Sequence, residues 1–185
     1  MPWPKLVLLD RDGVINADSP NYILTPAAWE ALPGSLEAIA RLSQIGIQVA
    51  ICTNQSAVGR GMLEAATLRA IHAKLNAQLT AVGGELSGIF VCPHAPQDQC
   101  NCRKPAPGLC QQALAATSHR SDEALFIGDS QRDLEAARAA GITAWLVRSG
   151  NGALLERQSN DPSLPVFDDL ADAVNALLKK GSGDA

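Results

Sequence analysis

The sequence predicts an α/β fold in which helices cover both faces of a doubly wound parallel sheet, giving three layers. Short apolar segments rich in β-branched residues are typical of strands buried on both faces of such a sheet. These segments alternate with longer amphipathic stretches of helical periodicity, an alternation that implies right-handed crossovers between parallel strands. With 185 residues, 46% of them hydrophobic, the chain suits one domain with a sizeable core.

The expected strands are residues 5–9, 47–52, 88–92, 124–127 and 143–147. The expected helices are residues 35–44, 64–82, 108–117, 132–140 and 170–178. Gly141 directly follows the fourth of these helices and suits its C′ position. Two long irregular segments, 17–33 and 93–107, are too short for an inserted domain, so we expect no large cap domain. A single domain is expected over 1–180 and a disordered tail over 181–185.

Charge and composition favour a small molecule as the partner. A net charge of −4 argues against non-specific binding to nucleic acid or to an anionic membrane. The chain starts without a basic segment followed by a long apolar one, and no apolar stretch is long enough to span a bilayer. We therefore expect a soluble, cytoplasmic monomer that binds neither nucleic acid nor membrane.

An acidic pair follows the first expected strand, in the sequence Asp10-Arg11-Asp12-Gly13. The carboxyl ends of parallel strands are where open α/β sheets place their chemistry. One carboxylate of such a pair can attack an electrophile while the other moves a proton. Gly13 permits the sharp exit from the strand that keeps both side chains exposed.

Polar residues also follow other strands and precede a helix. Thr53 and Asn54 follow the second strand, Lys104 precedes the third helix, and Asp129 follows the fourth strand. A parallel sheet would gather these side chains at one edge. Crowded carboxylates need a cation, and their hard oxygen ligands suit Mg²⁺, with Asp10 and Asp129 as its side-chain ligands.

Phosphoryl transfer uses each of these residue types. Asp10 would attack phosphorus and form an aspartyl-phosphate, and Asp12 would protonate the leaving alkoxide and then activate water. Lys104 would neutralise the equatorial oxygens, and Thr53 would add a hydrogen bond. Taken singly, Thr53 is more typical of a strand terminus and Lys104 of a solvated surface.

The chain resembles the haloacid dehalogenase (HAD) superfamily of phosphatases over nearly its whole length. The matching motifs are residues 10–16 (Asp-Arg-Asp-Gly-Val-Ile-Asn), 53–55 (Thr-Asn-Gln), 103–105 (Arg-Lys-Pro) and 128–130 (Gly-Asp-Ser). The resemblance implies a HAD-like Rossmannoid fold and the catalytic roles given above for Asp10, Asp12, Thr53 and Lys104. It also implies that the backbone carbonyl of Asp12 joins Asp10 and Asp129 as a Mg²⁺ ligand. The role of Asp133 stays open.

A cysteine–histidine cluster precedes Lys104, with Cys92, His94, Cys100 and Cys102 closely spaced. Four such ligands fit a tetrahedral structural Zn²⁺ with no open position for a catalytic water. The metal would hold the loop that presents Lys104. Free thiols in a polar loop are the alternative interpretation, and we expect Cys52 and Cys110 to lie in the core.

The zinc loop is similar to those of two families within the superfamily, the heptose-bisphosphate phosphatases and the histidinol-phosphate phosphatases. Ser56 and Arg60 resemble the first family. A guanidinium at Arg60 or Arg103 would suit a second phosphate on the substrate, although Arg60 is also compatible with an exposed turn. The residues expected to bind substrate are Asp18, Ser19, Asn21, Asn54, Gln55, Ser56, Arg60 and Arg103.

The resemblance implies a Mg²⁺-dependent hydrolase that removes the 7-phosphate of a heptose 1,7-bisphosphate, a step toward the ADP-activated heptose of lipopolysaccharide core. Histidinol-phosphate phosphatase is the enzymatic alternative. A non-catalytic phosphosugar-binding zinc module is an alternative of another class, and the acidic balance disfavours a polynucleotide end phosphatase. His72 and His119 lie outside the motifs and receive no role.

Overall fold

The computed structural model describes residues 3–159 and 161–181. Its strands are β1 (Leu6–Leu9), β2 (Gln48–Asn54), β3 (Gly88–Cys92), β4 (Ala124–Gly128), β5 (Thr143–Val147) and β6 (Val166–Phe167). Its α-helices are α1 (Ser35–Gln44), α2 (Ser56–Gly59), α3 (Ala65–Ala81), α4 (Gly108–Thr117), α5 (Gln131–Ala139), α6 (Gly152–Gln158) and α7 (Leu170–Gly181). Short 3₁₀ turns cover Pro96–Asp98 and Ser121–Glu123.

Within the described residues the strands form one 6-stranded sheet in the order β3-β2-β1-β4-β5-β6, and every pairing is parallel. Leu9 at the end of β1 lies opposite Ile51 of β2 and Ile127 of β4. The chain moves from β1 outward to β3 and then returns to place β4 on the other side of β1. The crevice of a doubly wound sheet opens at such a reversal, here at the carboxyl ends of β1 and β4.

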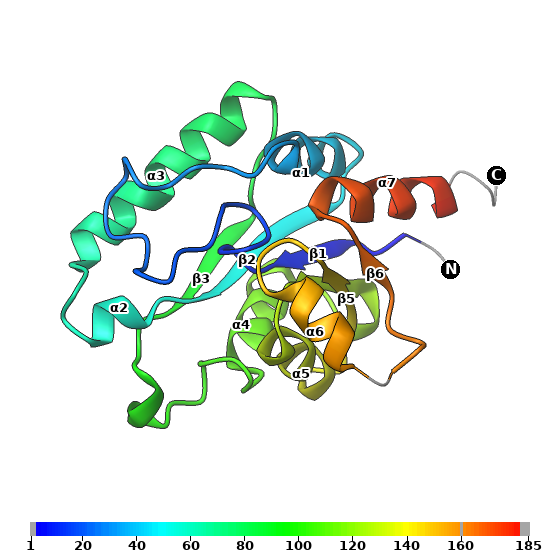
Figure 1. Ribbon diagram of the computed structural model, residues 1–185. Helices are drawn as coiled ribbons and strands as arrows, with labels where there is room; N and C mark the ends of the chain where they lie inside the picture. The colour runs from blue at the N-terminus through cyan, green and yellow to red at the C-terminus, as the bar shows by residue number, and fades with distance from the viewer. Residues whose placement is uncertain (1–2, 160, 182–185) are drawn as a thin grey trace.

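Helices cover both faces of the sheet (Figure 1), and the side chains of β1 show why. Val7 and Leu9 point into a core shared with α1, α3 and α7, whereas Leu6 and Leu8 point into a core shared with α4 and α5. Because successive strand residues face opposite sides, a continuously apolar strand fills both layers at once. The three-layer α/β prediction is confirmed.

The expected helices and strands are all present, with ends that shift by at most a few residues. The short elements α2, α6 and β6 were not expected, because each is too brief to show a period in the sequence. The last helix runs to Gly181, and the rest of the expected tail, 182–185, lies outside the described residues. Among the described residues, no helix combines the length and apolarity needed to cross a bilayer.

Candidate active site

The chemistry-bearing residues meet at the carboxyl edge of β1 and β4. Asp10 directly follows β1, and its backbone N–H donates to the carbonyl of Ile127 in β4 at 3.1 Å. Asp129 directly follows β4. The reversal in strand order therefore places two carboxylates, which are 119 positions apart in the sequence, beside one another.

A cavity of about 250 Å³ opens at this edge. Its lining is largely polar and comes from several segments: Asp10, Asp12, Asp18, Ser19, Pro20, Tyr22, Ile23, Asn54, Gln55, Ser56, Arg103, Lys104, Asp129, Ser130, Arg132, Asp133 and Asn151. Such a small, charged space suits a phosphate group and the adjoining part of a polar molecule.

Lys104 is the buried cation of the site. Its side chain is 2% exposed, and its Nζ lies 2.9 Å from Oδ1 of Asp10 and 2.6 Å from Oδ1 of Asp133. Burial by itself would lower the pKa of Lys104, but these two carboxylates outweigh burial and raise that pKa above its usual value. The ammonium therefore stays charged where a phosphoryl group would sit.

The side chain of Asn54 holds the main chain of Lys104 in place. The Asn54 side chain accepts from the backbone N–H of Lys104 and donates to its carbonyl, both at 3.0 Å. A residue at the end of β2 thus fixes the main chain of the loop that presents the lysine. Asn54 serves the site through this clamp as well as through its place in the cavity lining.

Asp10, Asp129 and Asp133 each offer an oxygen, and the three oxygens lie within 4.8 Å of one another. Burial and the charge of Asp133 raise the pKa of Asp10 to about 8, against the opposing effect of Lys104. Burial also raises the pKa of Asp129 to about 6, although hydrogen bonds from Asn151 oppose that shift. Three carboxylates thus lie around a single lysine, which is the environment expected of a divalent cation site.

Asp133 is already occupied by protein donors. It is fully buried, and its Oδ2 accepts from the backbone N–H of Asp129 at 3.2 Å and from the hydroxyl of Ser130 at 2.7 Å. Its other oxygen pairs with Lys104. Asp133 therefore orients Lys104 and the loop after β4, which leaves Asp10 and Asp129 as the side chains that best fit Mg²⁺.

Asn151 lies at the site although the sequence pattern did not predict it there. Its backbone N–H donates to Oδ2 of Asp129 at 2.7 Å, and its side-chain amide reaches the same oxygen at 3.2 Å. It lies in the loop that follows β5. Because functional residues gather at the carboxyl ends of parallel strands, this position was the one feature of the sequence that could have indicated Asn151. Gly13, with a φ of 84°, allows the loop after β1 to approach Asp129, because a Cβ there would collide with that carboxylate.

Asp12 lies at the cavity with its carboxylate surrounded by side-chain donors. Arg11 pairs with it at 2.9 Å, Asn16 donates to Oδ1 at 2.9 Å, and Gln55 donates to Oδ2 at 2.8 Å. Its side chain is 22% exposed, so one side of the carboxylate still faces the cavity. This placement suits a group that exchanges protons with a bound molecule.

The remaining residues predicted to bind substrate divide into two groups. Asp18, Ser19, Gln55, Ser56 and Arg103 line the cavity, whereas Asn21 and Arg60 do not, and Arg60 is exposed. Thr53 is buried behind the lining, where its hydroxyl accepts from Gln55 at 2.9 Å.

Arg132 also lines the cavity, although it was not among the predicted site residues, and Tyr22 lines it from the loop that carries Asp18 and Ser19. The signal for Arg132 was its position two residues after the fourth motif, which ends at Ser130.

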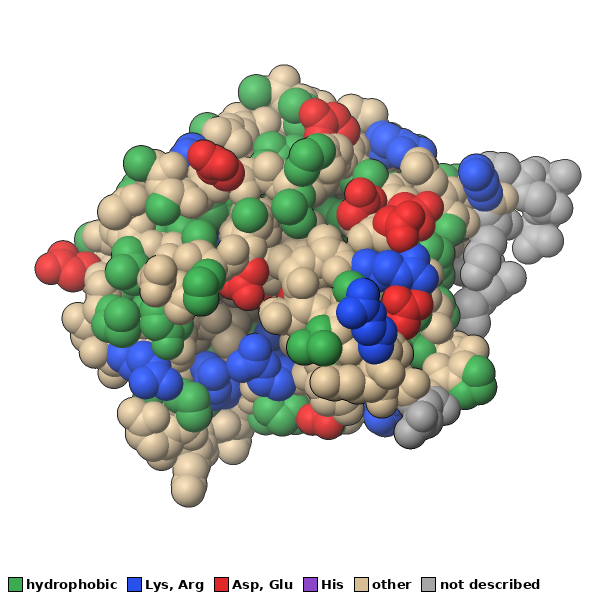
Figure 2. Space-filling view, in the orientation of Figure 1, with side chains coloured by type: hydrophobic (Ala, Val, Ile, Leu, Met, Phe, Trp, Pro, Cys, Tyr) green, Lys and Arg blue, Asp and Glu red, His purple; other side chains and the backbone are tan. Residues whose placement is uncertain are grey.

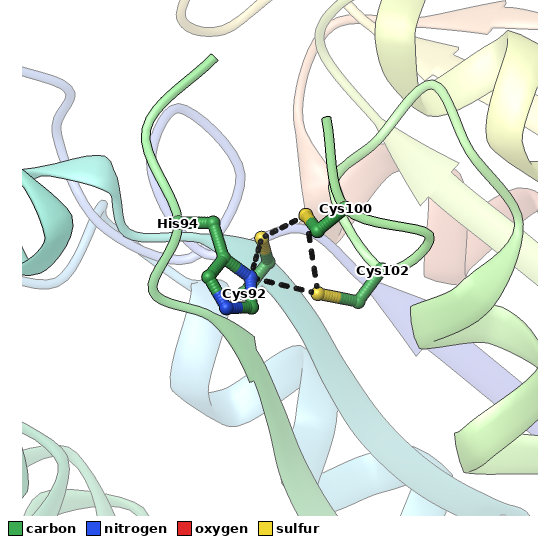
Figure 3. A group of neighbouring side chains, drawn as sticks. All are labelled: Cys92, His94, Cys100 and Cys102. Atoms are coloured by element: carbon green, nitrogen blue, oxygen red, sulfur yellow. Dashed lines mark hydrogen bonds between the residues drawn. The ribbon is translucent and has the colours of Figure 1, made fainter. Parts of the chain in front are cut away.

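The predicted zinc ligands come together at the end of β3 (Figure 3). The Sγ atoms of Cys92 and Cys100 are 3.6 Å apart, and Nδ1 of His94 lies 3.3 Å from Sγ of Cys102. A tetrahedron built on zinc–sulfur bonds would separate its sulfur ligands by roughly 3.8 Å. The four side chains point to a common centre at nearly this spacing, so the residues present fit Zn²⁺.

The zinc cluster is tied to the catalytic edge through Arg103, which follows Cys102 and precedes Lys104. Its guanidinium donates to the carbonyl of His94 at 3.2 Å. On the face of the molecule shown in Figure 2, basic side chains gather beside the loop that follows β3. The metal loop therefore shapes the basic rim of the cavity.

Comparisons with known proteins agree with this geometry. Residues 101–173 match a family model described as HAD-hydrolase-like. The chain is 45% identical to a D-glycero-beta-D-manno-heptose-1,7-bisphosphate 7-phosphatase of Bordetella bronchiseptica, covering 95% of this chain and 99% of that protein. It is 46% identical to the protein of the same name from Pseudomonas aeruginosa, covering 95% and 98% of the two chains.

A solved structure shows the same likeness. The crystal structure of D,D-heptose 1,7-bisphosphate phosphatase from B. bronchiseptica, complexed with magnesium and phosphate, superposes with a TM-score of 0.91. The two sequences are 45% identical, over 95% of this chain and 98% of that one.

Proposed function

This chain belongs to the D-glycero-beta-D-manno-heptose-1,7-bisphosphate 7-phosphatase family of HAD-like hydrolases, and we propose that it removes the 7-phosphate of that heptose bisphosphate. The observation that carries the reaction is the contact of Asp10 with Lys104 at a cavity shared with Asp12 and Asp129. The choice of sugar rests on the high identity to the named relatives over almost the whole chain. From the sequence alone, we further propose that the enzyme is a cytoplasmic monomer.

The first step uses Asp10 as nucleophile. One carboxylate oxygen attacks phosphorus, and the bond between phosphorus and the sugar oxygen breaks as the aspartyl-phosphate forms. Asp12 gives its proton to the departing alkoxide, which is a poor leaving group without it. Lys104 touches Asp10, so its charge lies where the equatorial oxygens of the phosphoryl group gain negative charge.

The second step regenerates the enzyme. Asp12, now ionised, takes a proton from water, and the resulting hydroxide attacks phosphorus. The bond between phosphorus and Asp10 breaks, which releases inorganic phosphate and restores both carboxyl groups to their starting states. Asp12 suits both roles because its carboxylate faces the cavity while its neighbours hold it in place.

Mg²⁺ would be held by the carboxylates of Asp10 and Asp129 and by the backbone carbonyl of Asp12. When bound, the ion supplies charge neutralisation that lets an anionic nucleophile approach an anionic phosphate. Asn151 orients the Asp129 carboxylate through two hydrogen bonds. Zn²⁺ at the cysteine–histidine cluster would keep the Lys104 loop in shape and takes no part in proton or phosphoryl transfer.

The proposal predicts the substrate preference of the purified enzyme with Mg²⁺. Among heptose 1,7-bisphosphate, hexose bisphosphates, sugar monophosphates and histidinol phosphate, the heptose bisphosphate should give the highest kcat/KM in a phosphate-release assay. Phosphorus NMR of the product should show the 1-phosphate retained. A higher kcat/KM with histidinol phosphate would favour the second family, and no release from any of these would favour a binding module.

Arg103 should recognise the second phosphate, because it lines the cavity, whereas Arg60 is exposed and does not line the cavity. Arg103→Ala should lower kcat/KM for the bisphosphate by about 10- to 100-fold, the loss expected of a charge-assisted hydrogen bond. Its effect on a sugar monophosphate should be smaller. Arg60→Ala, assayed in parallel, should change the bisphosphate-to-monophosphate ratio less than Arg103→Ala does, and the reverse order would restore Arg60 as the second-phosphate residue.

A further inference from the structure

Arg11 is a buried cation that the proposed reaction steps do not use. Its side chain is fully buried, between the nucleophile and the acid/base residue in the chain. The guanidinium donates from Nε to Oδ1 of Asp12 at 3.1 Å, and from Nη2 to Oδ1 and Oδ2 at 2.9 and 3.0 Å. A planar fork of donors that grips a carboxylate in this way fixes its plane as well as its position.

The other arm of the guanidinium contacts His72 on α3. Nη1 of Arg11 lies 3.1 Å from Nε2 of His72, although the two residues are 61 positions apart. A guanidinium nitrogen can only donate, so Nε2 accepts and the imidazole proton resides on Nδ1. Burial, and then the charge of Arg11, lower the pKa of His72 to about 4, against the effect of Asp12, so the ring is a neutral acceptor near neutral pH.

We propose that Arg11 and His72 act together as positioning residues that set the Asp12 carboxylate for proton transfer. This inference rests on the function proposed above. His72 anchors one arm of the guanidinium to the helix α3, and the remaining arm and Nε hold Asp12 with one side open to the cavity. Neither residue is placed to touch the phosphoryl group, since neither lines the cavity.

His72 matters because the Arg11 side of this contact is fully buried, whereas His72 itself is partly buried. Without an acceptor at that position, an Nη1–H of Arg11 would be left without a partner inside the protein, which is costly. The guanidinium would then turn toward another acceptor and carry the Asp12 carboxylate with it. Asn16 and Gln55 also donate to that carboxylate, so they would keep it near the site in a less defined orientation.

The leaving group reveals whether Asp12 is correctly placed. A sugar alkoxide needs a proton from Asp12 in order to leave, whereas p-nitrophenolate leaves readily without one. Hydrolysis of the aspartyl-phosphate needs Asp12 with either substrate. A misplaced Asp12 therefore slows the first release of the leaving group from an alkyl phosphate but spares the first release from an aryl phosphate.

The test compares His72→Leu, which removes the acceptor, with His72→Gln, which restores an acceptor oxygen. With the heptose bisphosphate, His72→Leu should lower kcat by about 10-fold or more, within the range of general acid–base catalysis, while KM stays within about twofold. With p-nitrophenyl phosphate, stopped-flow measurement should show an unchanged initial burst of p-nitrophenolate followed by its slow steady-state release. His72→Gln should recover most of kcat.

His119→Leu is the matched control, because His119 is half-buried beside Glu123 and belongs to no part of the site. It should behave like the parent protein. If His72→Leu fails to fold, Arg11→Lys keeps a cation but loses the fork and should give the same leaving-group pattern.

Equal slowing of the first leaving-group release from both substrates, or no slowing of either, would overturn the positioning role. Failure of the parent protein to release any phosphate would instead refute the proposed function.

Discussion

Replacing Asp10 by Asn is expected to abolish phosphate release while leaving the fold intact. The amide is not a nucleophile toward phosphorus and carries no charge for Mg²⁺, so kcat should fall by at least about 10³-fold and Mg²⁺ should bind poorly. The fold should tolerate the change, because Asn has nearly the same shape and can still accept from the backbone N–H of Arg11, as Asp10 does at 2.7 Å. Phosphate release and a Mg²⁺ titration by calorimetry provide the measurements.

Asp122→Asn is the matched control for this substitution. Asp122 is paired with Arg120 on the surface, in the turn before β4 and therefore at the opposite end of that strand from Asp129. The same chemical change there should leave turnover and Mg²⁺ binding unaltered. Turnover by Asp10→Asn at the parent rate would contradict the assignment of Asp10 as nucleophile.

Asp10→Asn should also change how stability depends on pH in the absence of metal. The folded protein holds the pKa of Asp10 at about 8, above its usual value of 3.8. As the pH rises between these values, the unfolded chain releases the Asp10 proton while the folded chain retains it, so the free energy of unfolding falls. Denaturation by urea should show this fall for the parent protein and a smaller fall for Asp10→Asn.

The position of the site could be predicted from the sequence because it follows from topology. Asp10 and Asp129 each come directly after a continuously apolar strand, and parallel strands bring their carboxyl ends to one edge. The cysteine–histidine cluster could be predicted as well, since its ligands are close in the chain. The short spacing of the zinc ligands and the position of the aspartates after strands can both be recognised in the amino-acid sequence.

The contacts within the site could not be predicted in the same way. Lys104 joins Asp10 to Asp133, and His72 contacts Arg11 from a helix whose buried side chains are apolar. These pairings depend on side-chain orientation across elements that are remote in sequence. Asn151 contacts Asp129 from a loop after β5, where the strand end marks the loop but the Gly-Asn-Gly sequence does not show that Asn151 reaches Asp129.

Loss of one zinc ligand should weaken catalysis without touching any catalytic group. Cys100→Ser removes a thiolate from a cluster whose Sγ–Sγ distance between Cys100 and Cys102 is 3.5 Å, so zinc affinity should fall by at least about 10- to 100-fold. Cys102 lies two residues before Lys104, and Arg103 between them donates to His94. Elemental analysis should show about one zinc per parent chain and much less in the variant.

Loss of zinc should displace Lys104 only in part, because the side chain of Asn54 still bonds to its main chain when zinc is absent. We expect kcat to fall by about 10-fold or more, as positioning losses do, with faster proteolysis of residues 93–103. Cys110→Ser makes the same exchange on the buried face of α4 and should lower stability but keep zinc. A fully active parent protein that contains no zinc would show that the four side chains hold this loop without a metal.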